Sequence, residues 1–343
     1  HLADLVDRAG DGIDTLFGRC AGYPAGAERT RERRLAYLRA RRIPEQAVYV
    51  NTVGRTSRQI RNEGELRERL ERLVDGIDGL REQDPAAIRR TVRDRVADDP
   101  ALLWALEPPP GLDLRFRLRE LTHMIALPLV LLVLSPLLLL GAPVFALLLR
   151  RHERSDPAPH LKPPPKLVQE LAALEDHLVQ NPFSAIGFVK PGRFRRLTLR
   201  GVLYVLDYAT RHVFNRENLA GVKTIHFARW VVLDGGRRVI FASNYDGSLE
   251  SYMDDFVDKI AWGLNVAFSN GYGFPRTRWL FLDGARDELA FKDYLKLHQV
   301  PTRVWYSAYG RLTNANIARN ARIRDGLRRE LGPEEAARWV QAL

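Results

Sequence analysis

The chain has 343 residues, of which 45% are hydrophobic and 28% are charged, so it is long enough for two domains and apolar enough to bury a core. Its single cysteine, Cys20, excludes an internal disulfide and favours a reducing compartment. The net charge of +11 indicates an anionic partner, either nucleic acid or an anionic lipid surface.

Residues 1–120 are expected to be mainly helical with one strand. The segment QAVYVNTV at 46–53 is rich in β-branched residues, which is typical of a strand. A lone strand is not stable, so this one is expected to join the sheet of a C-terminal domain. Between residues 63 and 81, apolar residues recur at helical spacing and predict an amphipathic helix: Leu66, Leu70, Leu73, Val74, Ile77 and Leu80.

An uncharged apolar run, MIALPLVLLVLSPLLLLGAPVFALLL, occupies residues 124–149. About 20 apolar residues are enough for a helix to cross a bilayer, so one interpretation is a single bent transmembrane helix. The other is a re-entrant segment that dips into one leaflet and returns. Basic residues stand on both sides of the run, whereas a spanning helix usually has them mainly on its cytoplasmic side: Arg115, Arg117 and Arg119 before it, and Arg150, Arg151, Arg154, Lys162 and Lys166 after it.

The re-entrant interpretation is favoured because the strand at 46–53 can join a C-terminal sheet only if both lie on the same side of the membrane. We therefore predict a re-entrant membrane segment over 121–151, broken at Ser135-Pro136, where proline removes a helix hydrogen bond. The residues expected to enter the membrane or mark its bends are Leu127, Pro128, Ser135, Pro136, Gly141 and Pro143. Arg150 and Arg151 are expected to contact anionic headgroups.

A Pro-rich linker is expected at 152–166, followed by an α+β domain over 167–343. Residues 183–214 mix clustered arginines, Arg195 and Arg196 among them, with a strongly apolar continuation. This pattern suits an interfacial helix whose arginines contact lipid headgroups, or equally a core helix with a solvated basic end.

A β-hairpin is predicted from Thr224–Leu233 and Arg238–Asn244, joined by Asp234-Gly235-Gly236, because Asp-Gly supplies the positive φ that such turns require. After it we predict a helix at 249–268, a strand at 278–282, a helix at 288–297, a strand at 301–306 and a helix at 312–331. This order predicts a ferredoxin-like antiparallel sheet with helices on one face.

No P-loop, GxGxxG, HExxH or GxSxG motif occurs, and the histidines lack metal-ligand spacing, so no metal site is predicted. His226 and Arg229 lie in an apolar strand, where burial is costly unless they are paired. Asp246 follows in the polar segment SNYDGS, as a proton-transfer group or as part of a turn. The candidate catalytic residues are therefore Asp246, Arg229 and His226.

Four other residues are candidates for cofactor binding. Asn316 and Arg319 lie on one helical face with Asn320, as a ligand-binding stripe or as an ordinary capped helix surface. Asn244 belongs to the polar segment before the long helix, and His298 lies near a predicted helix end, where it is either a ligand or a structural histidine.

Several blocks of residues 167–330 resemble a bacterial membrane-associated family: TIHFARWVVLDGGRRVIFASNYDGSLESYMDDF, FPRTRWLFLDGARDELAFKDYLK and VWYSAYGRLTNANIARNARIRDGL, with AYLRARRIPEQAVYVNTVGRTSRQI as an N-terminal block. The architecture is similar to that of the dimeric α/β-barrel superfamily, which includes dye-decolourising peroxidases and chlorite dismutases. The peroxidases carry a GxxDG motif. Here the stretch SNYDG matches it at Asp246 and Gly247, whereas Ser243 replaces the first glycine.

The resemblance implies haem as a cofactor and a homo-oligomer. His298 and His226 are the candidate haem ligands, and neither has a certain counterpart in that superfamily. Together with the apolar run, it predicts a membrane-associated enzyme, peroxidase-like, acting on a lipid or lipid-derived substrate at the cytoplasmic face of a bacterial inner membrane. The alternative is a non-catalytic module that binds lipid or a partner protein. Nucleic acid is not expected as a partner, because the positive net charge is the only feature that favours it, and the sequence lacks aromatic residues interleaved with a basic sheet surface.

Overall fold

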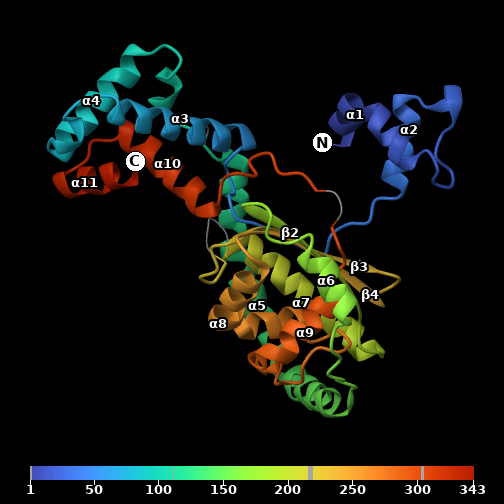
Figure 1. Ribbon diagram of the computed structural model, residues 1–343. Helices are drawn as coiled ribbons and strands as arrows, with labels where there is room; N and C mark the ends of the chain where they lie inside the picture. Colours follow the sequence, from blue (N-terminus) through green and yellow to red (C-terminus); the bar gives the residue numbers. More distant parts are fainter. Residues whose placement is uncertain (1, 110, 215–218, 303–304) are drawn as a thin grey trace. The chain divides into compact units, whose positions relative to one another are not determined.

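The computed structural model describes residues 2–109, 111–214, 219–302 and 305–343, and the chain divides into two compact units, His1–Glu45 and Gln46–Leu343 (Figure 1). The first unit is therefore much shorter than the expected N-terminal region of 1–120. It contains α1 (Leu2–Phe17), η1 (Gly26–Glu28) and α2 (Arg31–Ala40). Its small core consists of Val6, Ile13, Tyr23, Leu35 and Tyr37.

The second unit contains a four-stranded antiparallel sheet in the order β1-β3-β4-β2. Its strands are β1 (Ala47–Val50), β2 (Gln180–Phe188), β3 (Ile225–Leu233) and β4 (Arg238–Asp246). The strand predicted at 46–53 forms as β1 and pairs with β3. The predicted hairpin is present, and its turn residues Asp234, Gly235 and Gly236 all have positive φ.

The free edge of β1 is covered by side chains of α7 (Arg193–His212). The backbone N–H of Val48 donates to Asp207 Oδ1 at 3.1 Å, and the Thr210 hydroxyl donates to the Val48 carbonyl at 2.9 Å. An unprotected sheet edge would pair with other chains, so these two bonds both fix β1 and block its edge.

The helices α7, α8 (Leu249–Phe268) and α9 (Glu288–His298) pack on one face of the sheet (Figure 1). Alternate strand residues supply the sheet side of this core, among them Phe183, Trp230 and Phe241. Residues 183–214, whose character the sequence left open, are thus divided between β2 and α7. The short helix α6 (Pro165–Ala172) precedes β2.

The strand predicted at 278–282 is wrong in its extent. The segment instead forms a separate two-stranded hairpin of β5 (Thr277–Arg278) and β6 (Leu282–Asp283), because Trp279 and Leu280 both turn with positive φ. The short helix η4 (Gly284–Arg286) follows it. The strand predicted at 301–306 includes residues 303–304, which lie outside the described residues.

A helical core in the second unit brings distant segments together. It combines α3 (Ser57–Asp75), η2 (Leu80–Glu82), α4 (Pro85–Asp98) and η3 (Leu103–Ala105) with α10 (Asn314–Arg328) and α11 (Pro333–Ala342). Within it, Arg324 Nη1 lies 3.1 Å from Glu63 Oε1, and both side chains are buried. Helices predicted for an N-terminal region thus share their core with the C-terminal helices.

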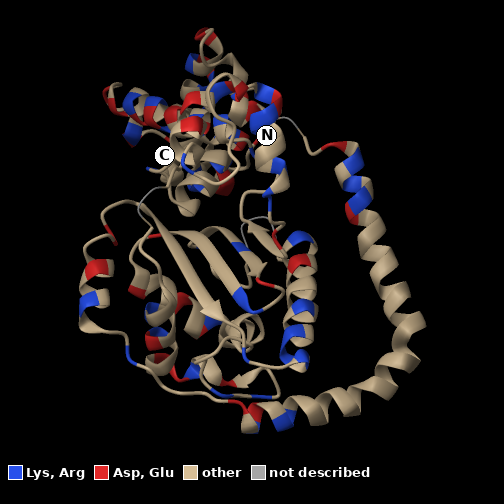
Figure 2. Ribbon diagram, turned by 90° about the vertical axis from the view of Figure 1, so that its right-hand side faces the viewer, with Lys and Arg blue, Asp and Glu red and all other residues tan. Residues whose placement is uncertain are grey.

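The apolar run lies within one helix, α5 (Leu114–Ser155), so the predicted break at Ser135-Pro136 is wrong. Pro136 cannot donate a hydrogen bond to the Leu132 carbonyl four residues earlier. The Ser135 hydroxyl donates to that carbonyl instead, at 2.7 Å, and so satisfies the group that proline leaves free. The helix is bent rather than broken, and its middle carries no Lys, Arg, Asp or Glu (Figure 2).

By length and composition, α5 is able to cross a membrane, and none of its most apolar window is buried in the protein. A core helix of similar composition would be covered by other elements, so the exposure of α5 requires another apolar environment. The structure therefore agrees with a membrane-associated α+β protein.

Candidate functional site

Both ends of α5 dock onto the same helix, α7. At the N-terminal end, the Tyr208 hydroxyl donates to the His123 carbonyl at 2.9 Å, the His123 and His212 rings lie 4.6 Å apart, and His212 lies 3.0 Å from Glu120. These contacts hold the residues just before the apolar run against the C-terminal end of α7.

The C-terminal end of α5 docks onto the start of α7. The His152 ring stacks on Phe194 at 4.8 Å, and Leu149 packs with Val202. The Arg195 guanidinium donates to Asp156 Oδ2 at 2.6 Å, and the Arg195 side chain is almost fully buried. Arg195 therefore anchors the helix and does not face lipid headgroups as predicted.

Glu153 makes a second anchor at this end of α5. Its buried carboxylate accepts hydrogen bonds from the Thr277 hydroxyl and from the backbone N–H groups of Trp279 and Leu280, at 2.8–3.0 Å. These bonds stabilise the turn of the β5–β6 hairpin, where Trp279 and Leu280 have positive φ. Arg150, which was predicted to contact lipid headgroups, pairs with Glu153 and lies over the Trp279 ring. Its guanidinium is therefore at least partly engaged by contacts within the protein.

Lys190 lies beside this anchor, and its burial lowers its pKa to about 8. Its ammonium donates to the Ser269 carbonyl at 2.9 Å. The unfolded chain keeps the Lys190 proton up to about pH 10.5, whereas the folded chain releases it near pH 8. The unfolded state therefore binds more protons between these values, and the free energy of unfolding rises with pH in that window.

We expect this rise to reach about 3 kcal/mol and to vanish in Lys190→Met. Urea unfolding of both proteins from pH 7.5 to 10.5 measures it. Parallel stability curves for the wild type and the variant would contradict the prediction.

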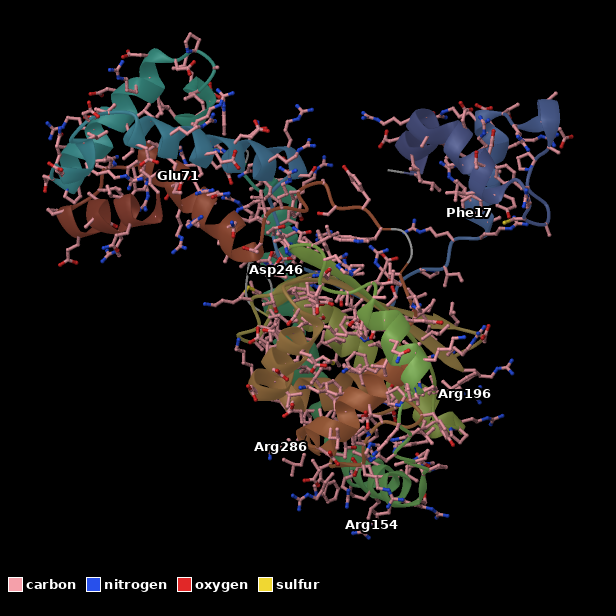
Figure 3. The ribbon with its side chains drawn as sticks, viewed as in Figure 1. Phe17, Glu71, Arg154, Arg196, Asp246 and Arg286 are labelled. Atoms are coloured by element: carbon pink, nitrogen blue, oxygen red, sulfur yellow. The ribbon has the colours of Figure 1, made fainter. Side chains whose placement is uncertain are left out.

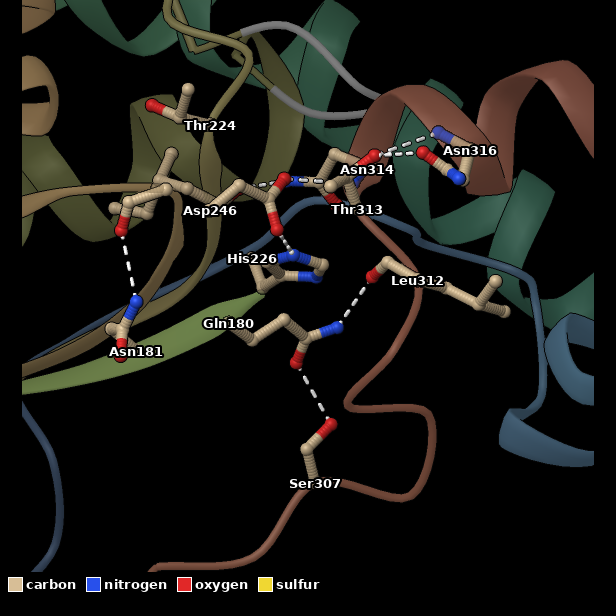
Figure 4. A network of polar contacts seen from close by, with 12 residues as sticks. Gln180, Asn181, Thr224, His226, Asp246, Ser307, Leu312, Thr313, Asn314 and Asn316 are labelled. Carbon is tan, nitrogen blue, oxygen red and sulfur yellow. Dashed lines mark hydrogen bonds and ion pairs between the residues drawn. The ribbon is translucent and has the colours of Figure 1, made fainter. Parts of the chain in front are cut away.

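A buried polar network surrounds Asp246 at the end of β4 (Figure 4). Its carboxylate lies 2.6 Å from His226 Nε2 and accepts the backbone N–H of Asn314 at 2.8 Å. The Asn314 amide donates to the carbonyls of Lys223 and Ile225. Asp246 thus joins the sheet to the N-terminus of α10, where the helix dipole favours a negative charge.

A β-bulge lets His226 reach Asp246. The register of β3 against β4 shifts between Ile225 and Phe227, so His226 is an extra residue in the strand. Without the bulge, strict alternation would place His226 on the same face of the strand as Ala228. The Nδ1 atom of His226 is buried and has no hydrogen-bond partner among the described residues.

Gln180, at the start of β2, ties the loop before α10 to this network (Figure 4). Its amide donates to the carbonyls of Tyr309 and Leu312, and its carbonyl accepts the Ser307 hydroxyl. The sequence reasoning did not single out Gln180, because no local pattern marks a residue whose partners lie about 130 positions further along the chain.

A cleft with a volume of about 320 Å³ adjoins the network. Polar and aromatic side chains line it, among them Thr52, Asn244, Trp305 and Tyr306. The Tyr309 hydroxyl bonds to Thr52, and burial raises the pKa of Tyr309. Of the predicted binding residues, Asn244 is the one that borders this cleft.

The other predicted site residues lie apart from Asp246. The Arg229 side chain is exposed on β3, whereas the side chains that form the network are buried or half-buried. Asn316 takes part in the cap of α10, where its backbone N–H donates to Thr313 Oγ1 at 3.0 Å. Arg319 follows on the same helix and is half-buried. Figure 3 shows Arg154 at the bottom of the view, Arg196 at its right-hand side and Asp246 near its middle, so neither arginine lies at the network.

The described residues do not fit a haem. The His298 Nδ1 atom is bonded to the Tyr294 carbonyl, and the ring borders a cavity of about 40 Å³. His226 is buried, and its Nε2 atom is bonded to Asp246 Oδ1. Asp246 Oδ2 accepts the N–H of Asn314, so both carboxylate oxygens already have partners. The apolar cavity between the sheet, α7 and α8 has a volume of about 160 Å³, which is too small for a haem, and no histidine is among its lining residues.

We expect Asp246→Asn to lower the free energy of unfolding by about 2 kcal/mol, because it removes a charge-assisted bond to His226 and a charge at the α10 N-terminus. Urea unfolding measures this loss. The matched control is Asp258→Asn on the exposed surface of α8, which should change stability by less than about 0.5 kcal/mol. Equal effects of the two substitutions would show that the network does not hold α10.

Comparison with protein-family models, curated protein sequences and solved structures finds no match to this chain. The resemblance to the dimeric α/β-barrel superfamily therefore stays a prediction, and the function must follow from the geometry of the site itself.

Proposed function

We propose that this protein is a monotopic membrane protein that lies on one leaflet and handles a lipid or lipid-derived molecule there. The observation that carries the proposal is the docking of both ends of α5 onto α7. The proposal keeps the predicted topology, in which the segment enters and leaves the same leaflet, and replaces the predicted helix break with a bent helix.

Helix lengths support this topology. The segment of α5 from Glu120 to His152 is about 48 Å long, whereas the part of α7 from Phe194 to His212 is about 27 Å long. A helix fixed at both ends of a shorter one must bend outward between its attachments. The hydrocarbon core is about 30 Å thick, so a spanning helix would place Glu120 and His152 on opposite sides, where one α7 could not hold both.

The surface beside α5 also suits lipid. Leu197, Tyr204 and Val205 are exposed on α7. Trp262 is exposed on α8, and Trp279 is exposed in the turn of the β5–β6 hairpin. Tyrosine and tryptophan favour the depth of the headgroups, where one end of the ring is apolar and the other wet. Basic residues on both flanks of α5 favour contact with an anionic leaflet. The cytoplasmic leaflet of a bacterial inner membrane, which is the predicted location, is such a leaflet.

Cysteine labelling tests the topology. In a Cys20→Ser background, Arg115→Cys and Arg154→Cys place one thiol at each end of α5, both at exposed positions. In sealed vesicles, a membrane-impermeant maleimide should label both variants from the same side. Labelling from opposite sides would establish a spanning helix and overturn the proposal.

We also propose that the sheet is ferredoxin-like, with β2, α7, β3, β4 and α8 as its successive elements. Two features support it: β4 lies between β2 and β3, and the outer edge of β2 carries the bridge from Ala185 to Gln299. The Val300 N–H donates to the Ser184 carbonyl at 2.8 Å, so the chain after α9 runs along this edge. The expected homo-oligomer stays a prediction.

A catalytic role of the His226–Asp246 pair is the second candidate function. The observation that favours it is the 2.6 Å contact of a buried histidine with a carboxylate beside a cleft of about 320 Å³. Such a pair can accept and return a proton. Mass spectrometry of lipids incubated with the reconstituted protein should show a product that is lost in His226→Gln; an unchanged lipid profile with wild-type protein would remove this candidate.

A further inference from the structure

An apolar cavity lies between the sheet and the helices α7 and α8. Its volume is about 160 Å³, and its lining surface is almost wholly apolar. Phe183, Trp230 and Phe241 line it from the sheet, while Leu206 and Met253 line it from the helices. A cavity of about 150 Å³ with such a lining stays dry and binds an apolar molecule such as benzene, so this cavity suits a hydrocarbon group.

The cavity borders the surface on which α5 docks. Val205 and Trp262 line it, and both are exposed, at 63% and 46%. Val266 lines it too and packs in the cluster that contains Leu149 of α5. The cavity is therefore continuous with the apolar surface that the protein turns toward α5.

We propose that this cavity holds the distal end of one acyl chain, which enters from the leaflet between Val205 of α7 and Trp262 of α8. The inference rests on the proposed monotopic function, because the leaflet supplies the chain. It deepens that function by naming the ligand: the hydrocarbon end of a lipid, with the polar headgroup left outside.

The chemistry of the lining selects this occupant. The polar side chains in it are Thr210, Tyr252 and the indoles of Trp230 and Trp262. The two hydroxyls are used in bonds to Val48 and Ser243, and the buried Trp230 N–H is the one of these donors with no partner among the described residues. A headgroup placed inside would lose its hydration and gain at most one such donor, which is costly. A hydrocarbon chain that enters from the leaflet exchanges one apolar environment for another, so it enters without a cost of desolvation.

A photo-crosslinking experiment tests the inference with the full chain reconstituted in vesicles of phosphatidylethanolamine and phosphatidylglycerol. The probe is a phosphatidylcholine with a diazirine at the end of one acyl chain. Mass spectrometry should place crosslinks on the cavity residues Met253 and Phe256 as well as on α5. A second probe, with its diazirine next to the headgroup, should label neither cavity residue.

Two glycine variants sharpen the test. A Cβ atom at Gly263 would meet Ile260 at an ordinary contact distance, and Gly263 lines the cavity, so Gly263→Leu is expected to occupy part of the cavity. The matched control is Gly201→Leu on α7, where a side chain has open space and does not line the cavity. Crosslinks at Met253 should fall at least about tenfold in Gly263→Leu, since an acyl chain that enters a cavity already filled by leucine overpacks it, which typically costs at least about that factor.

The outcomes separate the two proposals. Crosslinks on α5 without any on the cavity residues would overturn the acyl-chain site and keep the monotopic function. Absence of crosslinks on α5 and on the cavity alike would overturn the membrane proposal itself. Crosslinks between two protein chains at the cavity would identify a second copy as the occupant and also overturn the inference. A circular dichroism spectrum of Gly263→Leu that matches that of Gly201→Leu shows that this variant is folded.

Discussion

Replacing Leu132 and Leu139 together with arginine is expected to release the protein from membranes. Both residues are exposed in the middle of α5. An arginine at the centre of an apolar helix costs about 2.5–3.5 kcal/mol on insertion, so two cost about 5–7 kcal/mol, a loss of roughly four to five powers of ten in membrane partitioning. Flotation with vesicles of phosphatidylethanolamine and phosphatidylglycerol measures the bound fraction.

The matched control for this prediction is the pair Leu16→Arg and Leu289→Arg. These leucines are about as exposed as the pair in α5, at 75% and 65%, but lie outside the apolar run. Both control substitutions should leave the protein in the membrane fraction. If the α5 variant also floats with the vesicles, another surface holds the protein on lipid.

Replacing Glu63 with alanine is expected to lower the free energy of unfolding by about 3–5 kcal/mol, because it leaves a buried guanidinium without its charge partner. Glu63 accepts from Arg324 and from the Gln59 amide, and Arg324 donates also to the carbonyls of Trp104 and Glu107. The pair therefore ties α3 and η3 to α10. Urea unfolding followed by circular dichroism measures the loss.

Two further variants show whether the buried charge is the cause. Glu65→Ala, on the exposed side of α3, should change stability by less than about 0.5 kcal/mol. The double variant Glu63→Leu with Arg324→Met removes both charges and fills the space with apolar atoms. It should recover most of the stability, because a buried ion pair is often replaced by apolar residues at little cost. A double variant as unstable as Glu63→Ala would assign the loss to packing instead.

Local chemistry explains which elements were predictable. The Asp234-Gly235-Gly236 turn requires positive φ, and the strands beside it alternate, so the hairpin follows from a few adjacent residues. The apolar periodicity over 63–81 likewise predicts a helix, and the structure shows α3 over Ser57–Asp75. Its predicted C-terminal end is wrong, because the helix is capped at Gly76 and Leu80 lies in η2. Proline effects are also local, yet the break predicted at Pro136 was wrong because the neighbouring Ser135 hydroxyl satisfies the freed carbonyl.

The candidate site was partly predictable for the same reason. His226 and Asp246 each drew attention as a polar residue in or beside an apolar strand, and the structure brings them together. Arg229 drew attention on the same ground but lies exposed, because strand alternation and a bulge decide which face each residue takes. Gln180 and the α10 N-terminus join the site through long-range contacts that no local pattern records.

The sequence by itself determined that the chain has an apolar segment long enough to enter or cross a membrane, because 26 consecutive residues carry no charge. The tertiary structure decided how that segment is used. The contacts of His123 with Tyr208 and of Asp156 with Arg195 hold both its ends on α7. They join residues 39 and 85 positions apart, and such pairings depend on the packing of whole helices rather than on local propensity or periodicity.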